Sequence, residues 1–297
     1  MKAIYSSFCI EMEEISSEIK DLSQEMYIEK HISIPEISVI PLQLLNLYLF
    51  HANVPKFLRK KYCTTSGLIN LGLDMHDLVT NQKELDELRI KNRQMSVLAG
   101  DYFSSICYLL LAKEGLFKKA GHLAIGISGV TTAKMELYNL NNGKNFNSVE
   151  QIYDLIKIRE SNLYIQFLDE LKSAELILFW KSIIENIVMF FLLLDETKAE
   201  NIKLNNFSYY LLNYYTSSQE IMEIERAQSM TEVNNKIKLL YHKYNINFKL
   251  EELLANTYYN INSQINCLED TFIQEALLCI LKSCNSTQYR PGILEKI

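Results

Sequence analysis

Residues 92–114 read NRQMSVLAGDYFSSICYLLLAKE and carry the strongest helical pattern in the sequence. Apolar side chains recur there at spacings of three and four, the spacing of one face of an α-helix. The members of this face are Met95, Leu98, Tyr102, Ile106, Leu109 and Leu110. A small pair, Ala99 and Gly100, stands mid-helix. Because a mid-helix glycine costs about 0.8–1 kcal/mol relative to alanine, we expect Gly100 to let another helix backbone come close.

A carboxylate, Asp101, directly follows this glycine in an otherwise apolar neighbourhood. A buried carboxylate is costly unless a partner compensates its charge. We therefore expect Asp101 to be buried and to join two helices through a hydrogen bond. The candidate partners are His76, Arg93 and a helix N-terminus.

The predicted helix before this one ends in a polar patch within GLDMHDLVTNQ, residues 72–82. Asp74 and Asp77 are three residues apart, and Asp77 and Asn81 are four apart, so each pair shares a helix face. His76 stands among them. We interpret the patch as a solvated or internally paired helix end. The alternative is the wall of a polar binding site.

The whole sequence favours an all-α fold. Its 297 residues include only 9 Gly and 4 Pro, whereas sheet-rich folds need turn residues at every strand end. Helical periodicity predicts helices near 5–28, 38–52, 64–82, 92–114, 116–139, 147–172, 174–195, 204–215, 217–243, 248–263 and 267–284.

Length and charge restrict the organisation and the function class. We expect residues 1–200 to form one helical region and residues 201–297 a second region packed on it, within one continuous domain. The net charge of −6, from 30 Lys+Arg and 36 Asp+Glu, argues against a general nucleic-acid binder, because such proteins must neutralise phosphates.

The cysteines and apolar runs predict a cytoplasmic protein. None of the six cysteines forms a Cys-x-x-Cys pair or lies near a histidine pair, so we expect buried, reduced thiols. The most apolar stretch, residues 174–196, is interrupted by Lys181 and Glu185. Since a span needs about 20 apolar residues, we expect a core helix and no transmembrane segment.

Two blocks carry a resemblance to a known family. LDMHDLVT at residues 73–80 and KNRQMSVLAGDYFSSICYLLLA at residues 91–112 resemble component 1 of bacterial heptaprenyl diphosphate synthase. This is the small, non-catalytic subunit of a two-part enzyme that makes the menaquinone side chain. Weaker similarity continues through residues 126–140 and 179–194. The resemblance covers about the first two thirds of the chain and implies an isoprenoid-synthase-like helical bundle, degenerate or partial.

The first block also looks like a degenerate copy of the first metal-binding motif of trans-prenyltransferases. Catalytic members carry Asp-Asp-x-x-Asp on one helix. Matched to that motif, the three acidic positions fall on Asp77, Leu78 and Asn81, of which only Asp77 is acidic. The arginine pair that follows the motif is missing, and the nearest candidates for a second motif, at 195–196 and 269–270, lack the later Asp. Because Mg²⁺ needs several hard oxygen ligands, we expect no prenyl transfer by this chain alone.

The resemblance therefore implies an accessory subunit of a heterodimeric polyprenyl diphosphate synthase. A catalytic large subunit, component 2, would be the partner and would hold the Mg²⁺, and this chain would hold no cofactor. The candidate polar or interface residues are Asp74, His76, Asp77, Asn81, Arg93, Gly100, Asp101 and Tyr102.

Three alternatives stay open. The first is a stand-alone divergent prenyltransferase or terpene synthase that uses Asp74, Asp77 and Asn81 as unusual metal ligands. The second is a helical interaction module with no isoprenoid role. The third concerns ligands. The cations of residues 56–61 could hold a diphosphate or touch an anionic membrane, although a solvated face is the simpler interpretation. The aromatic segment 207–215 could contact a prenyl chain, although a core segment is the simpler interpretation.

Overall fold

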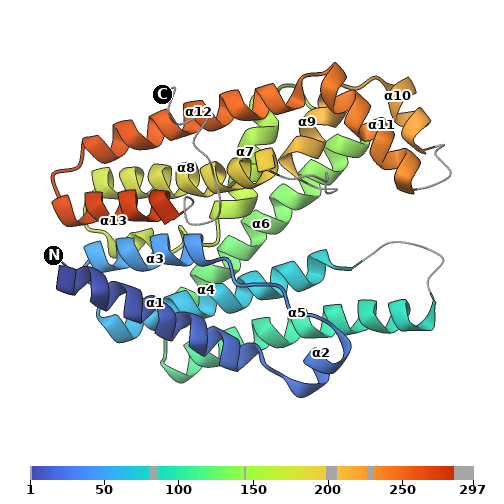
Figure 1. The fold of residues 1–297 in the computed structure, drawn as a ribbon. Coiled ribbons are helices and arrows are strands. Elements are labelled where there is room, and N and C mark those ends of the chain that lie inside the picture. The colour runs from blue at the N-terminus through green and yellow to red at the C-terminus, as the bar shows by residue number, and fades with distance from the viewer. Residues whose placement is uncertain (1, 80–85, 144, 199–205, 226–229, 284–297) are drawn as a thin grey trace. The chain divides into compact units, whose positions relative to one another are not determined.

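The computed structural model describes residues 2–79, 86–143, 145–198, 206–225 and 230–283. Within these ranges the regular elements are helices, with no strand (Figure 1). The prediction of an all-α fold is therefore confirmed. In chain order the helices are α1 (Lys2–Ser23), α2 (Met26–His31), α3 (Val39–His51), α4 (Lys56–Asp77), α5 (Glu87–Lys113), α6 (Phe117–Gly143), α7 (Val149–Ser161), the 3₁₀ helix η1 (Leu168–Glu170), α8 (Ala174–Lys198), α9 (Phe207–Tyr215), α10 (Ser218–Glu225), α11 (Met230–Lys243), α12 (Ile246–Asn266) and α13 (Thr271–Lys282).

The chain packs as two compact units, each assembled from separated stretches. Unit 1 comprises Met1–Ile127, Leu163–Trp180 and Asp270–Ile280, and unit 2 comprises Ser128–Asn162, Lys181–Glu269 and Leu281–Ile297. Helices α6, α8 and α13 therefore contribute residues to both units. The boundary expected at residue 200 lies outside the described residues and stays a prediction.

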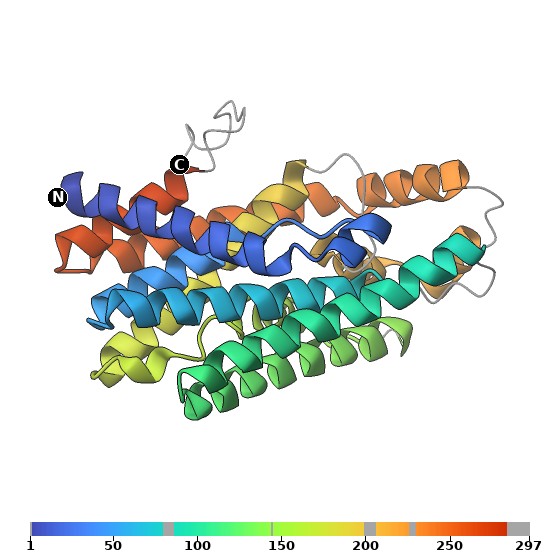
Figure 2. The ribbon, with the colours of Figure 1, turned by 90° about the horizontal axis from the view of Figure 1, so that it is seen from below.

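Unit 1 is organised around α4. This helix packs most extensively against α5, which runs back along it, and it also contacts α1 and α3 (Figures 1 and 2). The helix begins at Lys56, eight residues before its predicted start near residue 64. Each of the four cations in the helical segment 56–61 lies near a carboxylate outside α4.

These pairs join α4 mainly to α1. Arg59 donates to both carboxylate oxygens of Glu11, at 3.2 and 2.6 Å, and both side chains are buried. Arg59 also donates to the Asn46 side-chain oxygen of α3 at 3.1 Å. More exposed pairs repeat the contact with α1, Lys56 with Glu14 and Lys60 with Glu18, and Lys61 lies 3.8 Å from Glu114 at the end of α5. Arg59 is thus a core residue, whereas Lys56 lies on a solvated face, and all four cations already have carboxylate neighbours.

The core of unit 1 also contains the only tryptophan of the sequence, Trp180, which is fully buried. Its indole N–H donates to His51 Nδ1 at 2.9 Å, and its ring lies against Tyr48. The Tyr48 hydroxyl donates to the Tyr164 carbonyl at 2.9 Å. Tyr164 lies in a turn. The helix predicted for residues 147–172 ends earlier, at Ser161.

Unit 2 is held by α7, α8, α9, α11 and α12, with α9 packed against α7 and α12. Tyr153 on α7 contacts the Phe207 ring edge-on and hydrogen-bonds with Thr257 on α12 at 3.1 Å. On α12, Gln264 donates to Ser182 on α8 at 2.7 Å. Most of α9 is buried, so the aromatic segment 207–215 is mainly a core segment.

Helices α5 and α8 are long and apolar enough to cross a membrane by length and composition alone. A core helix of a soluble protein passes the same test, so the predicted lack of a transmembrane segment stays a prediction. The expectation of buried thiols is correct for Cys63 and Cys107 but wrong for Cys9, Cys267 and Cys279, which are exposed. Cys284 lies outside the described residues.

Candidate functional site

The residues matched to the metal-binding motif lie at the C-terminal end of α4. The helix ends at Asp77, which is exposed, and Leu78 follows as its C-cap with 53% of its surface exposed. Asp74 accepts a hydrogen bond from the Asn70 side-chain amide of its own helix at 2.8 Å. Asn81 lies outside the described residues. The end of α4 therefore presents an exposed apolar side chain at the position that the resemblance matches to a second carboxylate.

The close helix approach predicted from Gly100 is confirmed. A Cβ atom at Gly100 would lie 2.9 Å from the Gly72 carbonyl oxygen, and one at Gly72 would lie 3.0 Å from the Gly100 carbonyl oxygen. The His76 ring covers the same place, 2.5 Å from a Cβ at Gly100. These two glycines allow α4 and α5 to cross with their backbones in contact.

Asp101 differs from its prediction, because it is not buried. Its side chain is 69% exposed, and His76 Nε2 lies 3.7 Å from its carboxylate, too far for a hydrogen bond. Of the two expected side-chain partners, the neighbour is thus His76; the described ion pairs include none between Arg93 and Asp101. The expected buried hydrogen bond is wrong, because the carboxylate is on the solvent side of α5.

The inward face of α5 is also not the predicted one. The buried positions are Ser96, Ala99, Gly100, Phe103, Cys107 and Leu111. Of the predicted core face, Leu98, Tyr102 and Leu109 are 60%, 38% and 52% exposed. Its other members, Met95, Ile106 and Leu110, are half-buried. We call the exposed positions of α5 between Gln94 and Ala112 the outer stripe of α5; they are Gln94, Val97, Leu98, Asp101, Tyr102, Ser105, Tyr108, Leu109 and Ala112. A contiguous exposed apolar surface of this kind is typical of an interaction site.

The two segments considered for a second metal-binding motif have structural roles. Glu196 accepts hydrogen bonds from the backbone N–H groups of Phe207 and Ser208 at 2.9 and 2.6 Å, at the start of α9. Burial raises the pKa of Glu196. Asp270 accepts from the N–H groups of Phe272 and Ile273 at the start of α13. Both carboxylates are occupied by helix N-termini, which anions stabilise.

Sequence reasoning missed a charged cluster in unit 1. The Lys119 ammonium group is mostly buried and lies 2.9 Å from Asp169 and 2.6 Å from Glu170. Lys118 and His122 face the same Asp169 carboxylate, and Lys119 and Lys118 hold the pKa of that carboxyl below its usual value despite its partial burial. Because its members are about 50 residues apart, no local spacing could have revealed it. The ion pairs within the cluster leave no open binding site.

Within the described ranges, no group of three or more histidine, cysteine, aspartate or glutamate side chains is placed to hold a metal ion. The prediction that this chain carries no metal or cofactor stays a prediction.

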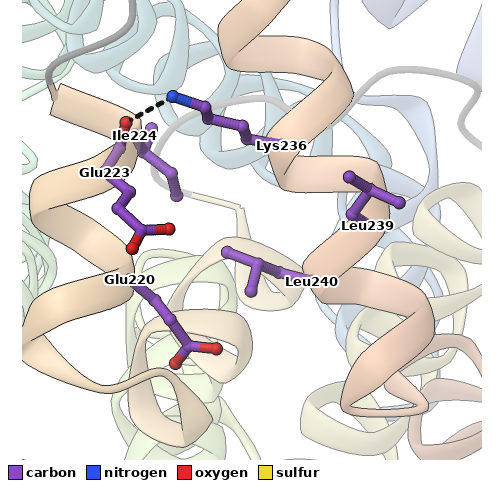
Figure 3. Close-up of a pocket in the computed structure, with 6 residues that line it drawn as sticks. All are labelled: Glu220, Glu223, Ile224, Lys236, Leu239 and Leu240. Carbon is purple, nitrogen blue, oxygen red and sulfur yellow. Dashed lines mark hydrogen bonds between the residues drawn. The ribbon is translucent and has the colours of Figure 1, made fainter.

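A small pocket lies in unit 2 between α10 and α11 (Figure 3). Its volume is about 110 Å³, whereas sites for small molecules usually have about 300–1,000 Å³. Its lining residues are Glu220, Glu223, Ile224, Lys236, Leu239 and Leu240. Lys236 Nζ donates to the Glu223 carbonyl at 2.8 Å. The pocket contains none of the residues predicted from the sequence and is too small for a long prenyl chain.

Comparison with known proteins identifies the family. Residues 25–245 match the profile of the family described as heptaprenyl diphosphate synthase (HEPPP synthase) subunit 1. The chain belongs to this family. It is similar to heptaprenyl diphosphate synthase component 1 of Geobacillus stearothermophilus, with 29% identity over 108 residues, 36% of this chain. That alignment spans 46% of the relative's own length.

Solved structures confirm the isoprenyl synthase fold of this subunit-1 chain. Geranylgeranyl pyrophosphate synthase from Corynebacterium glutamicum, complexed with calcium and isoprenyl diphosphate, aligns with a TM-score of 0.72 and 14% identity, over 97% of this chain and 99% of that chain. Decaprenyl diphosphate synthase from Rhodobacter capsulatus aligns with a TM-score of 0.68 and 11% identity, over 97% and 99%. At these identities the likeness establishes the fold alone.

Proposed function

We propose that this chain is the accessory, non-catalytic subunit of a two-component polyprenyl diphosphate synthase. The observation that carries the proposal is the end of α4, where an exposed leucine, Leu78, follows Asp77 at the position of a second motif carboxylate. Membership of the subunit-1 family supports it.

The chemistry gives the proposal its direction. Ionising an allylic diphosphate needs Mg²⁺ to stabilise the leaving group, and Mg²⁺ is held by several carboxylate and water oxygens. Leu78 supplies no oxygen, and Asp74 is already engaged by Asn70. The carboxylates Glu196 and Asp270 are engaged by helix N-termini. The partner, component 2, then supplies both Asp-rich motifs, the Mg²⁺ and the substrate sites.

This chain contributes by binding the catalytic partner, and the complex assembles in the cytoplasm. The outer stripe of α5 is the docking face for the partner, because it is an apolar surface otherwise left in water. The complex extends farnesyl diphosphate with isopentenyl diphosphate to a heptaprenyl product for the menaquinone side chain. This part of the proposal rests on the family resemblance.

A reconstitution assay tests the proposal. This chain, the two-motif partner from the same genome, and their mixture each receive farnesyl diphosphate, isopentenyl diphosphate and Mg²⁺, and products are separated by length. We expect long-chain product from the mixture only. A matched control mixture, in which one motif aspartate of the partner is replaced by asparagine, should be inactive. Mg²⁺-dependent product from this chain alone would overturn the proposal in favour of a stand-alone prenyltransferase.

A further inference from the structure

The outer stripe of α5 carries a single charge. Of its nine positions, only Asp101 has an acidic or basic side chain, and the others are apolar, aromatic, small or amide side chains. The exposed lysines Lys91 and Lys113 of the same helix lie beyond its two ends. Asp101 lies near the middle of the stripe, beside Tyr102 and one helical turn from Leu98. A surface that binds by its apolar side chains therefore has a carboxylate within the area it would cover.

Among the described residues, no lysine or arginine pairs with that carboxylate. The neighbouring side chain is His76, whose Nε2 lies 3.7 Å away. The Ser105 hydroxyl donates to the Asp101 backbone carbonyl at 2.8 Å, so its proton is not directed at the carboxylate. The Asp101 side chain is 69% exposed and is therefore hydrated in the isolated chain.

Covering the stripe removes this water. An unpaired carboxylate then loses its hydration without compensation, which disfavours the complex. A second copy that packs stripe on stripe brings no Lys, Arg or His at these nine positions, so this pairing buries two carboxylates without a cation. A partner with a cation opposite Asp101 avoids this cost and gains a charge-assisted hydrogen bond.

We propose that Asp101 determines partner choice at the outer stripe: it accepts a hydrogen bond from a lysine or arginine of the docked subunit and disfavours pairing with a second copy of this chain. This inference rests on the proposed function for the docked subunit, but its self-pairing half concerns this chain alone. Asp101 is a specificity-determining residue here and takes no part in chemistry.

One substitution tests both halves with opposite expected results. In Asp101→Asn, the dissociation constant of the complex with the two-motif partner should rise about 30-fold or more, since a buried charge pair loses one member. Self-association of the lone chain should instead become about tenfold tighter or more, since two buried carboxylates are replaced by neutral amides. Sedimentation velocity or native mass spectrometry at low salt measures both.

A matched control removes an equal charge elsewhere. Glu251 is an exposed carboxylate on α12, and Glu251→Gln should change neither equilibrium by more than about threefold. Circular dichroism of each variant confirms that it is folded. If Asp101→Asn weakens or strengthens both associations together, or leaves both unchanged while the wild-type complex forms, the inference is wrong. If the wild-type mixture forms no complex, the proposed function fails instead, and the self-association measurement still tests Asp101.

Discussion

At the scale of single residues, the buried indole N–H of Trp180 depends on His51 for its hydrogen bond. His51 Nδ1 accepts the indole N–H at 2.9 Å and is the acceptor for this buried donor. Replacing His51 by phenylalanine keeps a ring of similar size but leaves the buried N–H without an acceptor. We expect His51→Phe to lower the free energy of unfolding by about 1–3 kcal/mol.

Urea unfolding followed by tryptophan fluorescence measures this loss, because Trp180 is the only tryptophan in the sequence. The exposed His242 on α11 offers a control, and His242→Phe should stay within about 0.5 kcal/mol of the wild type. Equal stability of the two variants would contradict the role of the hydrogen bond.

The glycine crossing makes a second prediction at this scale. A Cβ at Gly100 would stand 2.9 Å from the backbone oxygen of Gly72, so the helices must move apart to accept it. We expect Gly100→Ala to destabilise the protein by about 1–3 kcal/mol. In contrast, a Cβ at Gly121 on α6 meets nothing within 4 Å, and Gly121→Ala should stabilise it by about 0.5–1 kcal/mol. Thermal unfolding measures both, and shifts of the same sign would refute the packing argument.

At the scale of elements, the attachment of α1 to α4 depends on one buried ion pair. Arg59→Met would leave Glu11 buried without its cation, and breaking a buried pair costs about 3–5 kcal/mol. Lys56→Met removes a more exposed cation from the same interface and should cost less than about 1 kcal/mol. Hydrogen exchange of α1 and denaturant unfolding compare the two. Similar losses would mean that apolar packing, rather than the ion pair, holds α1.

The junction of α10 with the end of α11 depends on pH. Glu220 accepts hydrogen bonds from Lys243 at 2.6 Å and Tyr244 at 2.7 Å, and Lys243 lowers its pKa to about 2. Since the folded pKa lies below the unfolded one, this contribution is full above about pH 4.5 and is lost as the pH falls towards 2. We expect Glu220→Gln to cost about 1 kcal/mol at pH 7, a difference that shrinks below pH 4. A constant difference across pH 3–7, measured by urea unfolding with circular dichroism, would contradict this.

Local pattern predicted which segments are helices better than which faces they bury. Helix α5 is apolar around most of its circumference, so the stripe containing Leu98 and the stripe containing Phe103 both fit the helical period. The small residues Ala99 and Gly100 mark the buried side, because only they allow close approach to α4. The early start of α4 could not be predicted, since the carboxylates that neutralise Arg59 and its neighbours belong to distant segments.

For the whole molecule, the fold and the family were predictable, because the blocks at 73–80 and 91–112 are distinctive. The candidate site was only partly so. The pattern led to the neighbourhood of His76, Gly100 and Asp101, but it placed the carboxylate in the core. The exposure of a side chain depends on how the helices pack. A carboxylate among apolar residues has the same sequence pattern on a buried helix face as on an exposed one.

A whole-molecule prediction follows because prenyl transfer needs two metal-binding motifs. Restoring the first motif in the double variant Leu78→Asp/Asn81→Asp should not give Mg²⁺-dependent turnover of prenyl diphosphates, because Glu196 and Asp270 remain bound to helix N-termini. Product analysis of the lone variant measures this, with the two-motif partner as the positive control. Turnover by the variant would mean that one metal-binding motif is enough for prenyl transfer.

The interleaved units described above restrict how such a protein can evolve. Each unit is built from three separated stretches, and α6, α8 and α13 belong to both. A recombination breakpoint at any single position between residues 128 and 269 divides both units, so neither can be exchanged or deleted as a gene segment. Under the proposed function, Leu78 is then a change at a single position within a bundle whose two units stay intact.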